Sequence, residues 1–257
     1  MKQYKGYLID LDGTMYLGDE PIEAASEFVD ALYSKGIPYL FVTNNSSKTG
    51  EDVAGKLNHM GIKANPEQVV TTSLATANYI KHHHEKAEVY VIGETGIRHA
   101  LEEKGLTVVE KEEADYVVVG LDREVNYEKF AKACLAVRNG AKFISTNGDI
   151  AIPTERGLLP GNGSLTSVVT VSTGVSPLFI GKPEKIIMEE ALEVLGLSKE
   201  DTLMVGDNYL TDIKAGINAG LDTLMVFTGV TPFESYQELE VKPTHYVHSL
   251  KEWIPNI

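Results

Sequence analysis

The sequence predicts an α/β fold in which a Rossmann-like, mostly parallel sheet forms the core and a second α/β domain is inserted into it. Short apolar runs alternate with longer segments of helical period, which is the pattern of βαβ units. The polar motifs ending at residue 47 and starting at residue 181 are too far apart for a single crossover helix. The interval between them has its own alternation of strands and helices, so we interpret it as an insertion.

The apolar runs and the helical periods define the elements in chain order. Strands are predicted at 7–9, 39–42, 89–92, 116–119, 142–145, 178–180, 203–205 and 223–226, and helices between them at 22–35, 127–139 and 185–195. In sheets of this kind, catalytic residues gather just beyond the carboxyl ends of the strands. Those ends are therefore the place to search for a site.

The insertion divides the chain into two domains. Residues 1–77 and 180–257 are expected to form the discontinuous core domain, and residues 78–179 the inserted one. No Pro-rich or Gly/Ser-rich linker marks either crossing. The positions of the crossings therefore rest on the spacing of the motifs alone.

Two carboxylates follow the first predicted strand. Asp10 and Asp12 stand at i and i+2 of an extended segment, so their side chains share a face, while Leu11 turns towards the core. Two anions this close repel each other, and the pair implies a metal ion, a general acid, or both. Gly13 permits a tight turn next to a ligand. The alternative is that Asp and Gly simply end a strand.

Three further polar clusters stand at strand ends. They are Thr43-Asn44-Asn45-Ser46-Ser47, Gly181-Lys182-Pro183, and Gly206-Asp207-Asn208 with Asp212 shortly after. Their position at the carboxyl ends of strands makes them candidates for a catalytic site. Taken singly, each cluster has a simpler explanation: a turn for Asn44-Asn45, a surface lysine for Lys182, and the start of a helix at 213–218 for Asp212.

The charge balance excludes some partners. The formal net charge of −14 opposes nonspecific binding to nucleic acid or to an anionic membrane. A phosphate site in such a chain needs local positive charge from a metal ion or a lysine. No apolar stretch of signal-peptide or membrane-spanning length is present, so we expect a cytoplasmic protein. Cys134, the one cysteine, is expected in the core, and His82-His83-His84 at a solvated helix end.

The four clusters, in this order, resemble the motifs of the haloacid dehalogenase superfamily of phosphotransferases. Those motifs are Asp-x-Asp-x-Thr, then Ser or Thr, then Lys, then paired acids. Together with Gly120-Leu121-Asp122 and Pro160-Gly161-Asn162-Gly163-Ser164, they look most like the p-nitrophenyl phosphatase branch and its bacterial acid sugar phosphatases. An insertion between the second and third motifs, as here, is the cap domain of that branch.

The resemblance implies a catalytic role for each cluster. Asp10 would be the nucleophile that forms an aspartyl phosphate, and Asp12 the general acid and base. Thr43, Asn44, Asn45 and Lys182 would bind the phosphoryl group.

The resemblance also implies a metal ion, Mg²⁺. Asp10 and Asp207 would supply carboxylate ligands and Asp12 its backbone carbonyl. Asp212 would hold the metal's waters or orient Lys182.

The predicted activity is hydrolysis of phosphate monoesters of small metabolites. Sugar or sugar-acid phosphates are favoured by the resemblance, with a nucleotidase or pyridoxal phosphate phosphatase as the alternative. Ile152 stands where related pyridoxal phosphatases carry a histidine, which counts against that substrate. The non-enzymatic alternatives are a phospho-accepting receiver and a phosphate-binding module. Receivers are about half this length, and their leading acids precede a separate acceptor.

The inserted domain is expected to set substrate choice. Candidate contacts are Thr146-Asn147-Gly148-Asp149 and Ile150-Ala151-Ile152-Pro153, although turn chemistry explains the first segment and core packing the second equally well. Cap surfaces of this branch often form dimers, so the resemblance also implies a possible homodimer through the cap.

Overall fold

The structure is a computed structural model and describes residues 2–257. Its internal contacts divide the chain into two compact units. The first contains the described residues up to Thr43, together with Gly50–Val70 and Lys182–Ile257, and the second contains Asn44–Thr49 and Thr71–Gly181. Within residues 2–257, no helix combines the length and apolar character needed to cross a membrane.

The first unit is built on a six-stranded sheet with the order β15-β14-β13-β1-β4-β5. Its strands are β1 (Gly6–Ile9), β4 (Tyr39–Thr43), β5 (Val69–Thr71), β13 (Thr202–Gly206), β14 (Asp222–Val226) and β15 (His245–Val247). The pairs from β15 across to β4 are all parallel. Every residue of β1 and β13 is buried, because helices cover both faces of the sheet.

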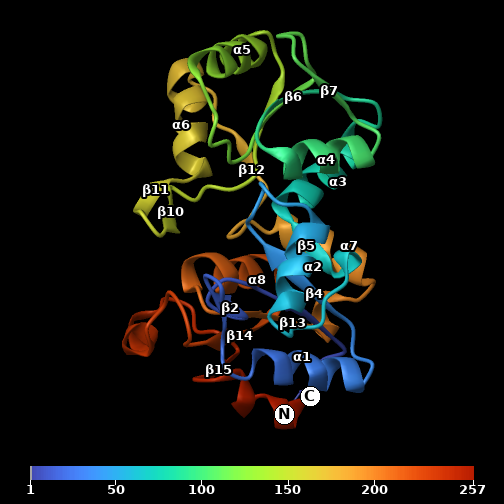
Figure 1. Cartoon of the computed structure of the whole chain (residues 1–257), viewed down its shortest axis with the longest axis vertical. Coiled ribbons are helices and arrows are strands. Elements are labelled where there is room, and N and C mark those ends of the chain that lie inside the picture. Colours follow the sequence, from blue (N-terminus) through green and yellow to red (C-terminus); the bar gives the residue numbers. More distant parts are fainter. Residues whose placement is uncertain (1) are drawn as a thin grey trace. The chain divides into compact units, whose positions relative to one another are not determined.

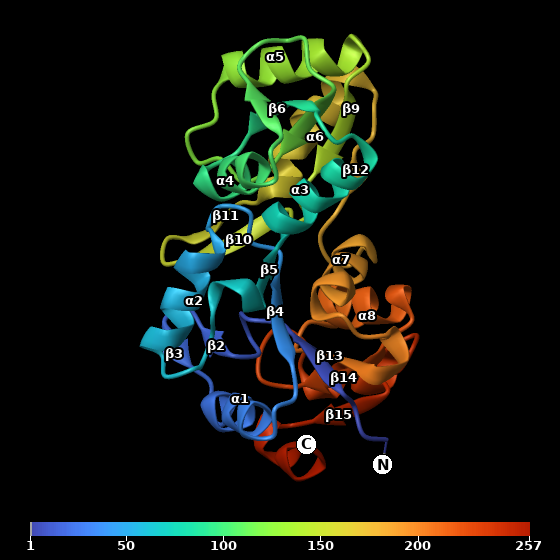
Figure 2. The same cartoon turned by 90° about the vertical axis from the view of Figure 1, so that its right-hand side faces the viewer.

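Four α-helices flank this sheet. They are α1 (Ala25–Ser34), α2 (Gly50–His59), α7 (Ile186–Leu195) and α8 (Lys214–Ala219). Figure 2 shows α7 and α8 together on one side of the sheet and α1 on the other. Phe28 and Leu32 of α1 pack with Tyr7 and Phe41 of the sheet in the main core cluster. A short antiparallel hairpin of β2 (Tyr16–Leu17) and β3 (Glu20–Pro21) follows β1.

The second unit is a five-stranded parallel sheet between two pairs of helices. Its strand order is β12-β9-β8-β6-β7, and every pairing is parallel. In Figure 1, α5 and α6 cover one face, and α3 and α4 the other. The strands are β6 (Glu88–Ile92), β7 (Thr107–Val109), β8 (Tyr116–Val119), β9 (Lys142–Ser145) and β12 (Leu178–Phe179). The helices are α3 (Thr72–His83), α4 (Thr95–Glu103), α5 (Tyr127–Arg138) and α6 (Asn162–Thr173).

Three smaller features of the second unit bear on the sequence predictions. Cys134 lies in the core formed by β6, β8, α5 and α6, which confirms the buried thiol. The histidines 82–84 are exposed at the end of α3. An antiparallel hairpin of β10 (Ala151–Thr154) and β11 (Gly157–Pro160) precedes α6. Core packing, one of the two explanations given for residues 150–153, is wrong, because Ile150 is 76% exposed.

The predicted α/β class is confirmed, and all eight predicted strands form with ends within one residue of those expected. Three further strands of the two main sheets, β5, β7 and β15, were not predicted, because they are three residues long and lack a long apolar run. The short hairpin strands β2, β3, β10 and β11 were not predicted either. The helix expected at 22–35 begins only at Ala25, because Ala24 adopts a left-handed φ of 66°.

The structure also differs from the sequence analysis near two predicted boundaries. The expected domain crossing at residue 77 falls inside α3, which lies wholly in the second unit. The helix expected at 213–218 runs instead from Lys214 to Ala219, after a π-helical turn over Tyr209–Ile213. That turn contains Asp212, and such turns are frequent at functional sites.

Candidate active site

Adjacent parallel strands of the first unit end in polar residues at the same edge of the sheet. β1 lies between β13 and β4, and Ile9 pairs with Val205 on one side and Phe41 on the other. This register places Asp10, which follows β1, level with Gly206 at the end of β13 and with Val42, one residue before the end of β4. Thr43 ends β4 and Asp207 follows β13. The topology therefore brings together side chains that are far apart in the sequence.

Lys182 is the cationic group of this cluster. Its ammonium contacts the Asp10 carboxylate, lies 2.7 Å from Asp212 Oδ1, and donates to the Val42 carbonyl at 3.1 Å. The side chain is 3% exposed. Burial alone would lower the pKa of Lys182, but the charges of Asp10 and Asp212 outweigh burial and raise it. Lys182 therefore remains an ammonium ion at physiological pH.

Asp10 is buried among other acids. Burial raises its pKa well above the usual range, the charge of Asp212 raises it further, and Lys182 opposes both. The sequence predicts charge repulsion between Asp10 and Asp12, whereas the acids that raise the pKa of Asp10 in the structure are Asp212 and Asp207. The reason is that Asp12 is exposed while the other three carboxylates are buried.

Asp12 lies at the start of the turn into the β2–β3 hairpin, where it forms an isolated bridge with Tyr16. Partial desolvation raises its pKa, and the nearby Lys56 opposes the shift. The ammonium of Lys56 lies 4.3 Å from the centre of the Tyr16 ring and donates to the Gly18 carbonyl at 2.7 Å. This arrangement ties the hairpin to α2 and leaves Asp12 open to solvent.

Asp207 is held by a loop that sequence analysis did not identify. Its Oδ2 accepts a hydrogen bond from the Val230 amide at 2.6 Å, and its Oδ1 accepts one from Thr14 Oγ1 at 3.1 Å. A Cβ on Gly229 would lie 2.1 Å from Asp207 Oδ2, so the loop requires glycine there. Thr228 Oγ1 donates to the Gly13 carbonyl at 2.6 Å. These contacts join segments that no local sequence pattern connects.

Asp212 contacts Lys182 directly. Its Oδ1 accepts from the ammonium, and its Oδ2 accepts from the Asn208 amide at 3.0 Å. A Cβ on Gly206 would lie 2.3 Å from Asp212 Cβ, so this approach also needs glycine. Oxygens of Asp10, Asp207 and Asp212 lie within 4.8 Å of one another, a donor set that suits a divalent metal ion.

Asn44 and Asn45 follow β4 directly in the chain but belong to the second unit. The side-chain oxygen of Asn45 accepts from the Ser47 amide at 2.8 Å and from the Lys48 amide at 3.1 Å, which makes it a turn-forming residue. Asn44 Nδ2 lies 3.3 Å from the Asp149 carboxylate. Within the predicted contact segment 146–149, Thr146 and Asn147 are buried.

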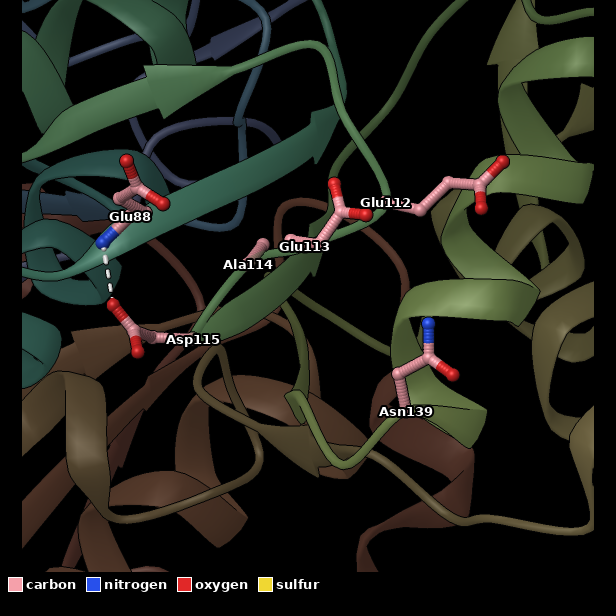
Figure 3. Close-up of a pocket in the computed structure, with 6 residues that line it drawn as sticks. All are labelled: Glu88, Glu112, Glu113, Ala114, Asp115 and Asn139. Atoms are coloured by element: carbon pink, nitrogen blue, oxygen red, sulfur yellow. Dashed lines mark hydrogen bonds between the residues drawn. The ribbon is translucent and has the colours of Figure 1, made fainter.

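A cavity of about 300 Å³ in the second unit has the wrong charge for a phosphate ester. Figure 3 shows the carboxylates of Glu88, Glu112, Glu113 and Asp115 around it, together with Asn139. Four acids gathered at one cavity repel a phosphate dianion. The electrostatic requirements of phosphate binding therefore favour the buried group of Lys182, Asp10, Asp207 and Asp212, which we call the Lys182 cluster.

Comparison with known proteins identifies the family of the chain. A family model for haloacid dehalogenase-like hydrolases matches residues 7–107, and a second model of HAD-like hydrolases matches residues 179–253. The chain is 67% identical to the 5′-nucleotidase YutF of Bacillus subtilis over the full length of both proteins. The chain belongs to the haloacid dehalogenase-like hydrolases.

Further relatives narrow the membership to the p-nitrophenyl phosphatase branch. The chain is 59% identical to the acid sugar phosphatase of Staphylococcus aureus, across 100% of this chain and 99% of that one. The p-nitrophenyl phosphatase structure from Archaeoglobus fulgidus superposes with a TM-score of 0.94 at 34% identity, and both chains are covered completely. This member of the family is a phosphatase, a hydrolase of phosphate esters.

Replacing Lys182 with methionine is expected to destabilise the fold by about 3–5 kcal/mol, because the change leaves Asp10 and Asp212 buried without their counter-charge. Urea unfolding at pH 8 measures the effect. Lys185→Met is the matched control, since Lys185 is exposed and pairs with Glu189 on the surface. An equal loss in both variants would contradict the structural role of the Lys182 cluster.

Divalent metal binding is expected to strengthen as the pH rises through about 6. Burial, and then the charge of Asp212, raise the pKa of Asp207 from 3.8 to about 6. The metal-free folded state therefore binds more protons than the unfolded state between these values, and its stability falls as the pH rises. A metal ion competes with those protons. Thermal unfolding with and without MgCl₂ at pH 5 and pH 7.5 should show a larger metal-induced shift at pH 7.5, and equal shifts would contradict the prediction.

Proposed function

We propose that this phosphatase is Mg²⁺-dependent and hydrolyses phosphate monoesters of small metabolites through an aspartyl-phosphate intermediate. The observation that carries the proposal is the buried cluster in which Lys182 contacts Asp10 and Asp212 close to Asp207. Phosphoryl transfer needs an in-line nucleophile, positive charge near the equatorial oxygens and a proton for the leaving group. The residues of the first unit supply a candidate for each requirement.

The charge of the cluster fits a divalent cation. Asp10, Asp207 and Asp212 carry three negative charges when ionised, whereas Lys182 supplies one positive charge. We assign Asp10 and Asp207 as carboxylate ligands of Mg²⁺ and the backbone carbonyl of Asp12 as a third ligand. Bound Mg²⁺ would offset charge on the phosphoryl oxygens and favour the ionised form of Asp10. Asp212 orients Lys182, the residue that it contacts.

Asp10 and Asp12 carry the two chemical steps. A carboxylate oxygen of Asp10 attacks phosphorus, the bond from phosphorus to the ester oxygen breaks, and Asp12 gives its proton to the leaving oxygen. Water then attacks the phosphorus of the aspartyl phosphate while Asp12 accepts its proton. The bond from phosphorus to the Asp10 oxygen breaks, which releases inorganic phosphate and regenerates the Asp10 carboxylate. The raised pKa of Asp12 supports its role as a proton carrier.

The proposed phosphoryl-binding groups extend from the strand ends into the segment that follows β4. Thr43 contributes its hydroxyl, Asn44 and Asn45 contribute amide groups, and Lys182 contributes an ammonium. Hydrogen bonds aimed at a developing charge act most strongly where water is excluded. Lys182 already meets that condition, since its side chain is buried.

Two substrate classes have support. Sugar or sugar-acid phosphates are proposed first, in line with the relative known as an acid sugar phosphatase. Nucleoside 5′-monophosphates are the second candidate, because the relative that is 67% identical is a 5′-nucleotidase.

We also propose a cytoplasmic location and a homodimer formed through the second unit. The exposed Tyr127 of α5 and Val171 of α6 support the homodimer, since they present apolar surface there.

Asp10→Asn is expected to lower turnover on the order of a thousandfold or more while retaining the fold, because an amide cannot form the aspartyl phosphate. Asp12→Ala should lower kcat by about a hundredfold or more, since both proton transfers are lost. Phosphate release from p-nitrophenyl phosphate measures both effects. Asp30→Asn is the matched control, because Asp30 pairs with Lys63 on the surface. Full activity of either site variant would refute the assigned role.

A substrate panel tests the reaction and ranks its substrates. Sugar phosphates, sugar-acid phosphates, nucleoside 5′-monophosphates and pyridoxal phosphate are compared by kcat/KM with Mg²⁺ and with EDTA. Release is expected only with Mg²⁺, and the Asp10→Asn protein provides the background. A ranking led by nucleotides would replace sugar phosphates as the proposed class. Undiminished release in EDTA would overturn the metal dependence.

A further inference from the structure

The segment that follows β4 is fastened within the second unit by buried hydrogen bonds. The Ser46 carbonyl accepts from Ser73 Oγ at 2.9 Å, and Ser46 Oγ accepts from the Leu121 amide at 3.0 Å. The Ser47 carbonyl accepts from the Gly96 amide at 3.2 Å. Both serines are buried. The backbone of residues 44–47 therefore has a defined conformation, although it contains no helix or strand.

The Asn44 carbonyl accepts two side-chain hydrogen bonds. Asn147 Nδ2 donates at 2.7 Å and Thr72 Oγ1 donates at 3.0 Å. Thr72 is completely buried and Asn147 is 5% exposed. A carbonyl oxygen has two lone pairs, so these two donors saturate it. Two such bonds to one backbone carbonyl restrict rotation of the peptide group that contains it.

That peptide group also carries the Asn45 N–H. The atoms from Cα of Asn44 to Cα of Asn45 lie in one plane, in which the trans N–H is directed opposite to the C=O. Fixing the Asn44 carbonyl therefore fixes the direction of the Asn45 N–H. Donors at the carbonyl also polarise the amide and strengthen its N–H as a donor.

Asn147 is itself held rigidly. Its Oδ1 accepts from the Asp149 amide at 3.1 Å, and its carbonyl accepts from Ser145 Oγ at 2.8 Å and from Asn162 Nδ2 at 3.0 Å. Asn162 is 2% exposed and begins α6. With both ends of its amide engaged in hydrogen bonds, Asn147 is suited to orienting its neighbours.

We propose that Thr72 and Asn147 are positioning residues for phosphoryl binding, acting through the Asn44–Asn45 peptide group. Their hydrogen bonds hold the Asn45 N–H in the orientation in which it donates to a phosphoryl oxygen. The inference rests on the proposed role of Asn45 in binding phosphate. It assigns to Asn147 a backbone-orienting role, whereas the sequence left a substrate contact and turn chemistry open for the segment 146–149.

Thr72→Val tests this role with a nearly isosteric change. It is expected to raise the inhibition constant of inorganic phosphate and the KM of p-nitrophenyl phosphate together, by roughly 3- to 10-fold, since one hydrogen bond that orients the amide is lost. Thr76→Val is the matched control, because Thr76 is buried in the same helix and its hydroxyl has no hydrogen-bond partner among residues 2–257. The control should leave both constants unchanged.

Asn147→Ala is the second variant and should produce the same parallel rise. Circular dichroism and the Mg²⁺-induced shift in Tm show whether each variant is folded with its metal site intact. Unchanged phosphate constants in both variants would overturn the inference. A loss of phosphate affinity accompanied by an equal loss of the Mg²⁺ shift would also overturn it, since that result indicates general disruption.

Calorimetric titration with inorganic phosphate separates this inference from the proposed function. Binding of phosphate does not require turnover, so the comparison of Thr72→Val with Thr76→Val remains decisive even if no ester is hydrolysed. An inactive wild-type protein would refute the proposed function. An active wild-type protein with equal phosphate affinity in the Thr72 and Thr76 variants would refute the positioning role alone.

Discussion

The ion pairs of Lys182 are the interactions on which the site depends. Removing several carboxylates from water costs several kcal/mol for each ion unless nearby charges and hydrogen bonds compensate. Lys182 contacts two of the buried acids, Asp10 and Asp212, and its third bond goes to the Val42 carbonyl. The ammonium is thus held at a single position by three acceptors. Its charge offsets only part of that of the acids, and the remainder favours protons or a divalent cation.

The parallel sheet makes this concentration of charge possible. Each parallel strand ends at the same edge, so Asp10, Thr43 and Asp207 become neighbours of that edge although they are distant in sequence. Close approach then depends on small residues. Gly13, with a φ of +92°, and Gly229 both leave room where a Cβ would collide with the Asp207 carboxylate. The arrangement of the site is therefore specified by topology and by missing side chains as much as by the charged residues.

The positions of the main strands and of the conspicuous polar residues could be predicted because each follows from a local pattern. Strands such as β1 and β8, buried on both faces, read as uninterrupted apolar runs. The loop that holds Asp207 could not be predicted, because the Val230 amide and the Thr228 hydroxyl act across strands and have no sequence signature. The acids that raise the pKa of Asp10 were misassigned for the same reason, since burial depends on the whole fold.

The relatives of this chain show why phosphoryl chemistry is easier to infer than substrate identity. Relatives that are 67% and 59% identical along the full chain are a 5′-nucleotidase and an acid sugar phosphatase. The phosphoryl group is common to both kinds of substrate, and the proposed residues Asp10, Lys182 and Asp207 act on it alone. Discrimination between leaving groups therefore has to come from other contacts, and a single apolar contact changes kcat/KM by only about 10- to 200-fold. Substitutions away from the Lys182 cluster can therefore change the preferred substrate while the chemistry is retained.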